Sequence, residues 1–361
     1  MEYMNDGYRK AQELSLNMGG WVGNSDWRGN YEGADKALDT LLAKNITIFA
    51  YEKPVTVTEI SSALGTSADY VEDIIEKMVE TRTLEKSTNK YQTTFPIFNE
   101  KQISDIWSGN LTMAKEKATE IFDMLSDLKT DIQDLGFYGC DSPFEKLLPM
   151  LISIICLETK GNLFEHSNLP FKGTDKAWYI LGWIGDFKGI SSKGGGLNIA
   201  HYDDTLPNCV DYYINNPWHG DSRSRETTTV LWNLFYGNQD SEFLKQEAHT
   251  LALLIESNKI EKIGNEYKIK IPILDENKGE YQKLVKILYP VIELSNKLQE
   301  VVNKRSLDTV RKHLPKRFDC DEFFGMYFSL NMIEFALFDL LNDNGVTLTS
   351  DMVSWLVLYK K

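Results

Sequence analysis

Hydrophobic and polar positions between residues 56 and 80 follow the spacing of two consecutive helices. Thr56-Val57-Thr58-Glu59 is a capping box, the pattern that starts a helix, and Gly65 is suited to end that helix. Ser67 is placed to cap a second helix. The apolar residues of the second helix form one stripe, which consists of Val71, Ile74, Ile75, Met78 and Val79.

Alternation replaces the helical spacing after residue 84, and this change predicts a β-hairpin. Leu84-Glu85-Lys86 leads into the polar turn Ser87-Thr88-Asn89-Lys90, and the return strand alternates through Tyr91, Thr93 and Phe95. Two short helices followed by a hairpin are the layout of a winged-helix domain, which favours regulation over catalysis. A preceding helix with Ala37, Leu38, Leu41 and Leu42 extends the predicted domain to residues 34–98.

The chain repeats itself at a distance of 176 positions (84 to 260, 91 to 267). The matching segments are Met78-Val79-Glu80 with Leu254-Ile255-Glu256, Leu84-Glu85-Lys86 with Ile260-Glu261-Lys262, and Phe95-Pro96-Ile97 with Ile271-Pro272-Ile273. Matches without a shift in offset predict an internal duplication of a winged helix followed by a helical segment. Chance similarity between amphipathic segments is the alternative.

The second copy is expected to be degenerate. Thr227–Tyr236 can form its first helix and Leu244–Ser257 its last, and Gly237-Asn238-Gln239-Asp240 between them leaves little room for a full helix-turn-helix. We therefore expect this copy to be structural or to bind a partner, not DNA.

These patterns predict an α+β fold that is mainly α, built from tandem winged-helix units and helical segments. The expected organisation is a Trp- and Gly-rich N-terminal arm (1–33), a winged-helix domain (34–98), a helical segment (99–160), a linker (161–174), a degenerate winged-helix-like unit with an aromatic-rich insertion (175–275) and a C-terminal helical segment (276–361).

Composition is that of an ordinary soluble protein of 361 residues, with a net charge of −14. The four cysteines are widely spaced and the N-terminus is polar, so we expect reduced thiols and a cytoplasmic location. The longest apolar run, Leu147 to Leu157, is too short to span a bilayer, so no membrane partner is expected.

Local charge argues against deep insertion of the second predicted helix into DNA. Its exposed positions are Asp69, Tyr70, Glu72, Asp73, Glu76, Lys77 and Glu80, and five of these seven are acidic. Carboxylates repel the phosphate backbone, so this face is either solvated or meets a basic protein surface. The remaining candidates for DNA contact are Thr66, Ser67 and Tyr70 at the helix start and Arg82, Lys86 and Lys90 on the wing.

The most basic stretch lies near residue 310 and contains Lys304, Arg305, Arg311, Lys312, Lys316 and Arg317. The corresponding region of the first copy is acidic and contains Asp123, Asp127, Asp131, Asp134 and Asp141. We expect these regions to pair across a pseudo-twofold axis, either within the chain or in a homodimer. Lys304, Arg305, Arg311 and Lys312 are therefore candidate partner-binding residues, with a phosphate-binding patch as the alternative.

The N-terminal arm contains two tryptophans and an arginine among glycines, Trp21, Trp27 and Arg28. Trp and Arg are typical of binding hot spots, so these residues are candidates for partner binding. The alternative is that both tryptophans only anchor the arm on the domain surface.

Four segments in the first quarter of the chain carry a resemblance to a known family. They are Gly20-Trp21-Val22-Gly23, Trp27-Arg28-Gly29, Leu42-Ala43-Lys44-Asn45-Ile46 and Ala50-Tyr51-Glu52-Lys53-Pro54. The chain resembles an uncharacterised family of Firmicutes winged-helix regulators whose genes tend to lie beside extracytoplasmic-function sigma factors. The resemblance implies a bacterial transcription regulator that acts on DNA or through a sigma factor, and it assigns no site residues.

No motif identifies an enzyme. His201-Tyr202-Asp203-Asp204 and Trp218-His219-Gly220-Asp221 place His near Asp, but neither has a known ligand spacing. We therefore expect no catalytic residue, metal or cofactor. The aromatic residues between 178 and 236 leave open an apolar effector pocket, so an enzyme or ligand sensor in this region remains the second alternative to a regulator and to a purely protein-binding module.

Overall fold

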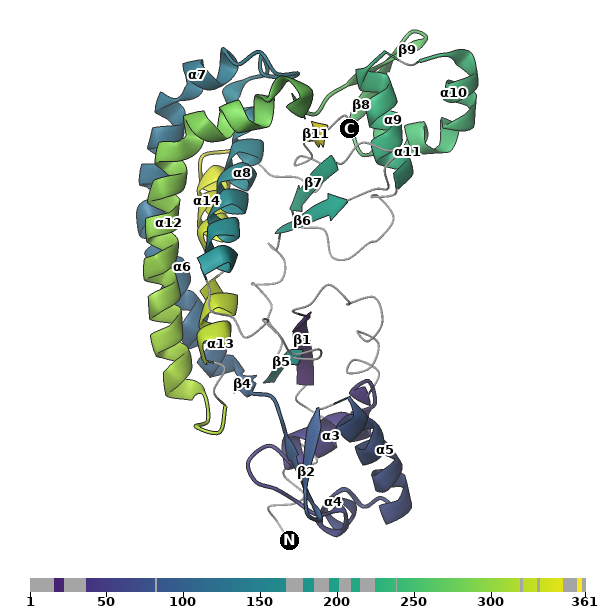
Figure 1. Cartoon of the computed structure of the whole chain (residues 1–361), viewed down its shortest axis with the longest axis vertical. Helices are drawn as coiled ribbons and strands as arrows, with labels where there is room; N and C mark the ends of the chain where they lie inside the picture. Colours follow the sequence, from purple (N-terminus) through teal and green to yellow (C-terminus); the bar gives the residue numbers. More distant parts are fainter. Residues whose placement is uncertain are drawn as a thin grey trace. The chain divides into compact units, whose positions relative to one another are not determined.

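The computed structural model describes residues 16–22, 37–81, 83–166, 178–184, 195–200, 209–214, 225–237, 239–318, 321–329, 332–346 and 356–358. Helices dominate and the strands are short, which confirms the predicted α+β, mainly helical class (Figure 1). The chain forms two compact units. The first unit comprises Met1–Trp107, Asn168–Phe187 and Ser306–Met326, and the second comprises Ser108–Ser167, Lys188–Arg305 and Tyr327–Lys361.

Three helices open the first unit. In α3 (Leu41–Phe49), the Thr40 hydroxyl accepts a hydrogen bond from the Ala43 amide. The predicted capping box begins α4 (Val57–Leu64), since the Thr56 amide donates to Glu59 at 2.7 Å and the Glu59 amide donates to the Thr56 hydroxyl at 3.2 Å. Gly65 ends α4 in the left-handed conformation with φ +64°, which a glycine adopts without steric cost.

The stripe predicted for α5 (Ala68–Glu80) forms the core of this unit. Val71, Ile74, Ile75 and Met78 are buried together with Ile60 of α4 and Ile46 of α3, and Val79 is partly buried. The prediction for Ser67 is wrong in one respect: the residue occupies the N-cap position, but its side chain makes no capping hydrogen bond.

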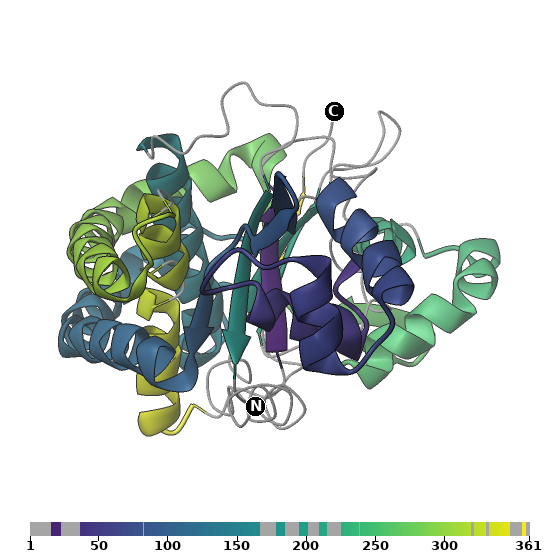
Figure 2. The ribbon, with the colours of Figure 1, turned by 90° about the horizontal axis from the view of Figure 1, so that it is seen from below.

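The predicted hairpin consists of β2 (Leu84–Ser87) and β3 (Lys90–Thr93), paired antiparallel, and β4 (Ile97–Asn99) follows. Part of the predicted N-terminal arm is a strand, β1 (Leu16–Val22). It pairs antiparallel with β5 (Trp178–Ile184), which pairs parallel with β4. A three-stranded sheet therefore unites segments that are far apart in the sequence (Figure 2).

Two long helices run in opposite directions, α6 (Glu100–Asp127) and α12 (Glu280–His313). Their direction follows from two contacts, because Asp105 lies beside His313 whereas Asn110 lies beside Arg305. The 34 residues of α12 span about 51 Å. Four further helices accompany them in the described part of the chain, α7 (Lys129–Gln133), α8 (Phe144–His166), α13 (Asp321–Ser329) and α14 (Met332–Asp343). The predicted linker at 161–174 is wrong for its first six residues, which continue α8.

Buried apolar residues fill the helical part of the second unit. Within α8 the run from Leu147 to Cys156 is buried throughout, as is most of α14. Among the described residues, the stretch Phe324–Leu341 has the length and hydropathy of a membrane-spanning helix, but 81% of it is buried inside the protein. Such burial is typical of a core helix.

The second unit also holds three short helices and a hairpin. The elements are α9 (Arg225–Phe235), α10 (Ser241–Gln246), α11 (Ala248–Glu256), β8 (Ile260–Ile263), β9 (Glu266–Ile269), β10 (Ile273–Asp275) and the 3-10 helix η2 (Glu276–Lys278). The single helix predicted at 244–257 is wrong, because the chain breaks at Glu247 into α10 and α11.

A four-stranded sheet has the order β10-β11-β7-β6, with β6 (Gly195–Ala200), β7 (Cys209–Ile214) and β11 (Leu356–Leu358). The C-terminal segment, predicted to be helical, thus ends in a strand. Here β11 pairs parallel with β10 and antiparallel with β7, just as β5 pairs parallel with β4 and antiparallel with β1.

The two hairpins recur with a constant offset of 176 positions (84 to 260, 90 to 266, 97 to 273). Their contacts recur as well. Lys86 lies 5.5 Å over the Tyr91 ring, and Lys262 lies 5.5 Å over the Tyr267 ring. The last turns of α5 and α11 also match, because the hydroxyls of Thr81 and Ser257 each donate to the carbonyl four residues earlier.

The two hairpins differ in the group that pairs with the outer edge of their second strand. In the first unit the backbones of Val55 and Tyr91 exchange two hydrogen bonds, at 2.9 and 2.7 Å. At the corresponding Tyr267, the side-chain amide of Gln239 donates to the carbonyl at 3.1 Å and accepts from the amide at 2.9 Å. A glutamine side chain therefore replaces a strand residue at this edge.

Replacing Gln239→Ala should leave the Tyr267 backbone unpaired. We expect the Tyr267 amide to exchange its hydrogen faster and the second unit to lose about 1–2 kcal/mol of unfolding free energy. Hydrogen-exchange mass spectrometry and urea unfolding measure these two quantities. Gln246→Ala is the matched control, because Gln246 is exposed and bonds only weakly to Glu242 at 3.4 Å. Equal effects of the two substitutions would contradict the role of Gln239.

Gly325→Ala should destabilise the packing of α13 on α12. A Cβ atom at this position would lie 2.9 Å from both Cα and Cβ of Leu307, so the helix backbones must separate. We expect a loss of about 1–3 kcal/mol, seen as a lower Tm in a thermal melt. Gly109→Ala is the comparison, because the added methyl group meets the flexible end of Arg305 rather than a backbone. A larger loss from Gly109→Ala would contradict this explanation.

Candidate functional site

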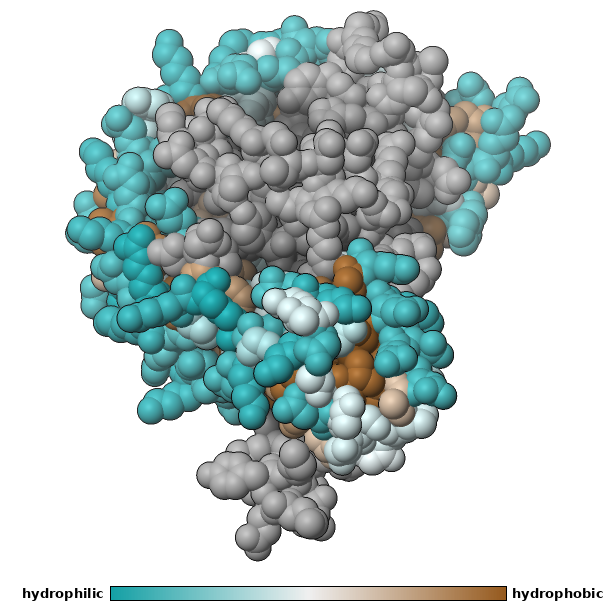
Figure 3. Space-filling view, turned by 60° about the horizontal axis from the view of Figure 1, so that its bottom comes forward, coloured by the Kyte–Doolittle hydropathy of each residue, from teal (hydrophilic) through white to brown (hydrophobic). Residues whose placement is uncertain are grey.

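The outward face of α5 is a row of carboxylates. Asp69, Asp73, Glu76 and Glu80 follow each other at helical spacing on the face opposite the buried stripe, and Glu72 lies beside them. All five are exposed. Tyr70 is 54% exposed at the start of the helix. Hydrophilic residues also cover much of the described surface that Figure 3 presents.

The residues predicted to contact DNA lie at two places in the first unit. Ser67 and Tyr70 are exposed at the start of α5, whereas Thr66 is partly buried and its hydroxyl donates to the Leu64 carbonyl at 3.4 Å. Lys86 and Lys90 are exposed on the hairpin. The sixth candidate, Arg82, lies outside the described residues.

Cations of the hairpin and of the preceding loop act on the same carboxylate. The Thr56 amide and then the Thr56 hydroxyl, as hydrogen-bond donors, lower the pKa of Glu59, and the positive charges of Lys90 and Lys53 lower it further. Lys53 and Lys90 therefore lie on one side of this unit. The pairing of Val55 with Tyr91 holds the loop and the hairpin together there.

Among the candidate partner-binding residues of α12, Arg305 contacts α6. Lys304, Arg311 and Lys312 are exposed, and the half-buried Arg305 donates to the Asn110 side-chain oxygen at 3.5 Å. Asp123 lies 13 positions beyond Asn110 (110 to 123), about 20 Å further along α6. The predicted pairing of Arg305 with the acidic segment inside the chain is therefore wrong, because the antiparallel packing places the two charged regions at opposite ends.

The loop after α12 packs through Arg317 on Tyr51, in the loop between α3 and α4. Its guanidinium lies 4.7 Å from the ring centre of Tyr51 and 4.5 Å from that of Phe318, and the two rings stack at 6.2 Å. This contact could not be predicted from the sequence, because a cation–π interaction between distant residues leaves no periodic signal. The only hint was the basic composition of the loop.

Several sequence candidates are described in part or not at all. The backbone of Trp21 lies in β1 opposite Tyr179. Trp27, Arg28, His201 and His219 lie outside the described residues.

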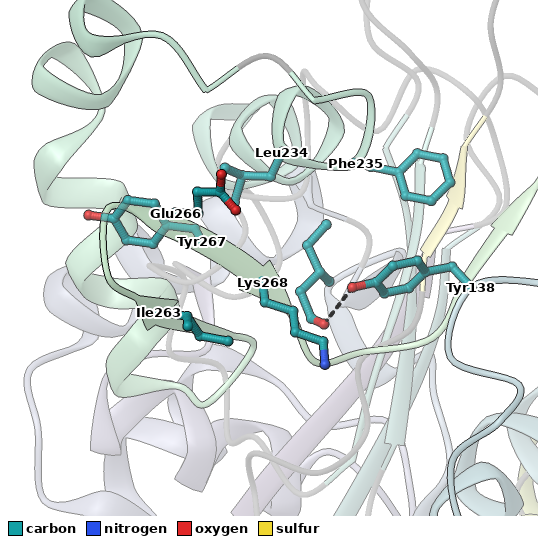
Figure 4. A pocket seen from close by; sticks show the side chains of 8 residues that line it. Tyr138, Leu234, Phe235, Ile263, Glu266, Tyr267 and Lys268 are labelled. Atoms are coloured by element: carbon teal, nitrogen blue, oxygen red, sulfur yellow. Dashed lines mark hydrogen bonds between the residues drawn. The ribbon is translucent and has the colours of Figure 1, made fainter.

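A pocket of about 270 Å³ opens in the second unit between α9 and the hairpin (Figure 4). Its lining is mainly apolar and consists of Tyr138, Leu234, Phe235, Ile263, Glu266, Tyr267, Lys268 and Ile269. The Tyr138 hydroxyl donates to the Ile269 carbonyl at 2.8 Å, and burial raises the pKa of this hydroxyl. The aromatic-rich region predicted to hold a pocket contributes only Leu234 and Phe235.

The helix of the second unit that corresponds to α5 has a different surface. On α11, Leu253 and Ile255 are each 42% exposed, and on the hairpin Ile263 is 57% exposed. The matching positions in the first unit are Lys77, Val79 and Ser87. One half thus presents carboxylates and the other presents apolar side chains.

Comparison of the chain with models of protein families, with curated protein sequences and with solved structures finds no match in any of the three.

Proposed function

We propose that this protein is a transcription regulator that contacts DNA and recruits or holds a protein partner. It contains two winged-helix units. The observation that carries the proposal is the order of elements in the first unit. Three helices (α3, α4, α5) and a hairpin (β2–β3) enclose one core. The second helix of the α4–α5 pair exposes the face opposite this core. This is the arrangement that winged-helix regulators use.

Internal duplication is part of this proposal. The constant spacing of the two hairpins and the repeated Lys–Tyr contacts support it. The parallel pairings of β4 with β5 and of β10 with β11 support it as well. In this proposal the second unit no longer has a DNA-binding helix, because α10 and α11 are short and α11 exposes Leu253 and Ile255.

The face of α5 is assigned to a basic protein surface instead of the major groove. Five exposed carboxylates would lie next to the phosphate backbone if α5 entered DNA, and each would be repelled. A sigma factor is the class of partner that the sequence resemblance suggests. A module that binds only protein is the second candidate, and the same acidic face favours it.

Chromatin immunoprecipitation of the tagged full-length chain tests the regulatory role. We expect enrichment at discrete upstream regions over an untagged strain, and altered transcripts from those regions when the gene is deleted. Partner binding without any enriched DNA would favour the protein-only module. Neither enrichment nor altered transcripts would contradict the proposed function.

Neutralising α5 tests which face meets DNA. We expect Glu72→Gln, Asp73→Asn and Glu76→Gln together to raise affinity for duplex DNA by a factor of about 2 to 10 at low salt, because repulsion falls. Fluorescence anisotropy with a labelled duplex measures the affinity. Asp123→Asn, Asp127→Asn and Asp131→Asn make the same charge change on α6 and α7 and should have less effect. A loss of affinity in the α5 variant would show that these carboxylates contact bases.

A further inference from the structure

We infer that the first unit binds the phosphate backbone of duplex DNA with a surface assembled from both halves of the chain. This basic face consists of Lys53, Lys86, Lys90, Lys316 and Arg317, all of which are exposed. The inference rests on the proposed function and adds to it the surface and the mode of contact. It requires no insertion of α5.

Contacts in the first unit link the members of this face. Lys86 lies over the ring of Tyr91, and the Tyr91 backbone is hydrogen-bonded to Val55, two positions beyond Lys53. Lys90 and Lys53 both act on the Glu59 carboxylate. The hairpin lysines and the loop lysine therefore belong to one continuous surface.

The loop after α12 extends that surface. Arg317 stacks on Tyr51, two positions before Lys53, and Lys316 precedes Arg317. Stacking on a ring fixes the guanidinium plane but leaves its edge free to donate to a phosphate oxygen. The cations that the second half contributes are thus held beside those of the hairpin.

Charge complementarity identifies a polyanion as the partner. The five cations outnumber the exposed carboxylates of the same loop and hairpin, which are Glu52, Glu59 and Glu85, and the Glu59 carboxylate is already engaged by Thr56. The acidic α5 and the α12–α13 loop lie on opposite sides of α3 (Figure 1). A duplex bound at the basic face would therefore avoid the carboxylates of α5.

The described surface favours nucleic acid over a membrane. Binding to a membrane surface usually adds an apolar anchor to the basic residues. The large hydrophobic side chains that are exposed in the described part of this unit are Leu41 and Tyr70, and neither belongs to the hairpin or to the α12–α13 loop. Counterion release from about five phosphate contacts predicts a slope near −4.5 for log K against log salt.

The test is fluorescence anisotropy of a labelled duplex with the full-length chain between 50 and 200 mM salt, roughly the range over which such contacts weaken. We expect the pair Lys86→Gln and Lys90→Gln, and separately the pair Lys316→Gln and Arg317→Gln, to reduce the slope by about 2 each. The control pair Lys286→Gln and Lys297→Gln removes equal charge from exposed positions of α12 and should change the slope by less than about 0.5.

Each outcome has a separate meaning, provided that circular dichroism shows a native melt for every variant. Equal slope changes in all three pairs would overturn the basic face, as would an effect of the hairpin pair without an effect of the loop pair. Tight binding to vesicles of anionic lipid, lost in the same variants, would overturn the assignment to DNA. No binding of DNA by the wild-type chain would instead contradict the proposed function itself.

Discussion

The antiparallel packing of α6 and α12 is the constraint on which the other contacts depend. Because the helices run in opposite directions, the end of each one carries the following loop toward elements from the other half of the sequence. Arg317, after α12, stacks on Tyr51, and Tyr138, after α7, pairs with Ile273 and donates to Ile269. A buried hydrogen bond between Thr159 of α8 and Ser295 of α12, at 2.9 Å, fixes the register of these two helices. The loop after α3 and the second hairpin are thus each contacted by residues that are distant in sequence.

The difference between local contacts and contacts of distant residues explains which features could be predicted from the sequence. The capping box at Thr56, the αL glycine at Gly65 and the hairpins are local, so periodicity and turn chemistry are sufficient to identify them. The sheet that joins β1 to β5 and the stacking of Arg317 depend on tertiary contacts, so no local pattern indicates them. The linker predicted at 161–174 depended on Pro170 and Gly173, which lie beyond the end of α8 at His166, so these residues do not show where the helix stops.

The candidate site shows the same division. The acidic face of α5 could be read directly from the sequence, because helical spacing decides which residues lie opposite the buried stripe. The basic stretch near residue 310 could also be read from the sequence, but the surface on which it lies could not be predicted. The opposite charges of this stretch and of the segment 123–141 suggested that the two pair. Instead, Arg305 packs against Gly109 and Asn110, which puts its guanidinium on the backbone of α6. Charge patterns indicate what a surface can bind, and packing decides which surface it is.

The position of Gln239 bears on the length of the loop that precedes α10. A side-chain amide reaches the edge of β9 from a loop of five residues between α9 and α10 (236 to 240), whereas the first half uses seven between α3 and α4 (50 to 56). The shorter connection is sufficient because the Gln239 side chain makes the two hydrogen bonds that the Val55 backbone makes with Tyr91. Alignment of the halves consequently needs a gap at this loop, whereas the hairpins align without one (84 to 260, 90 to 266).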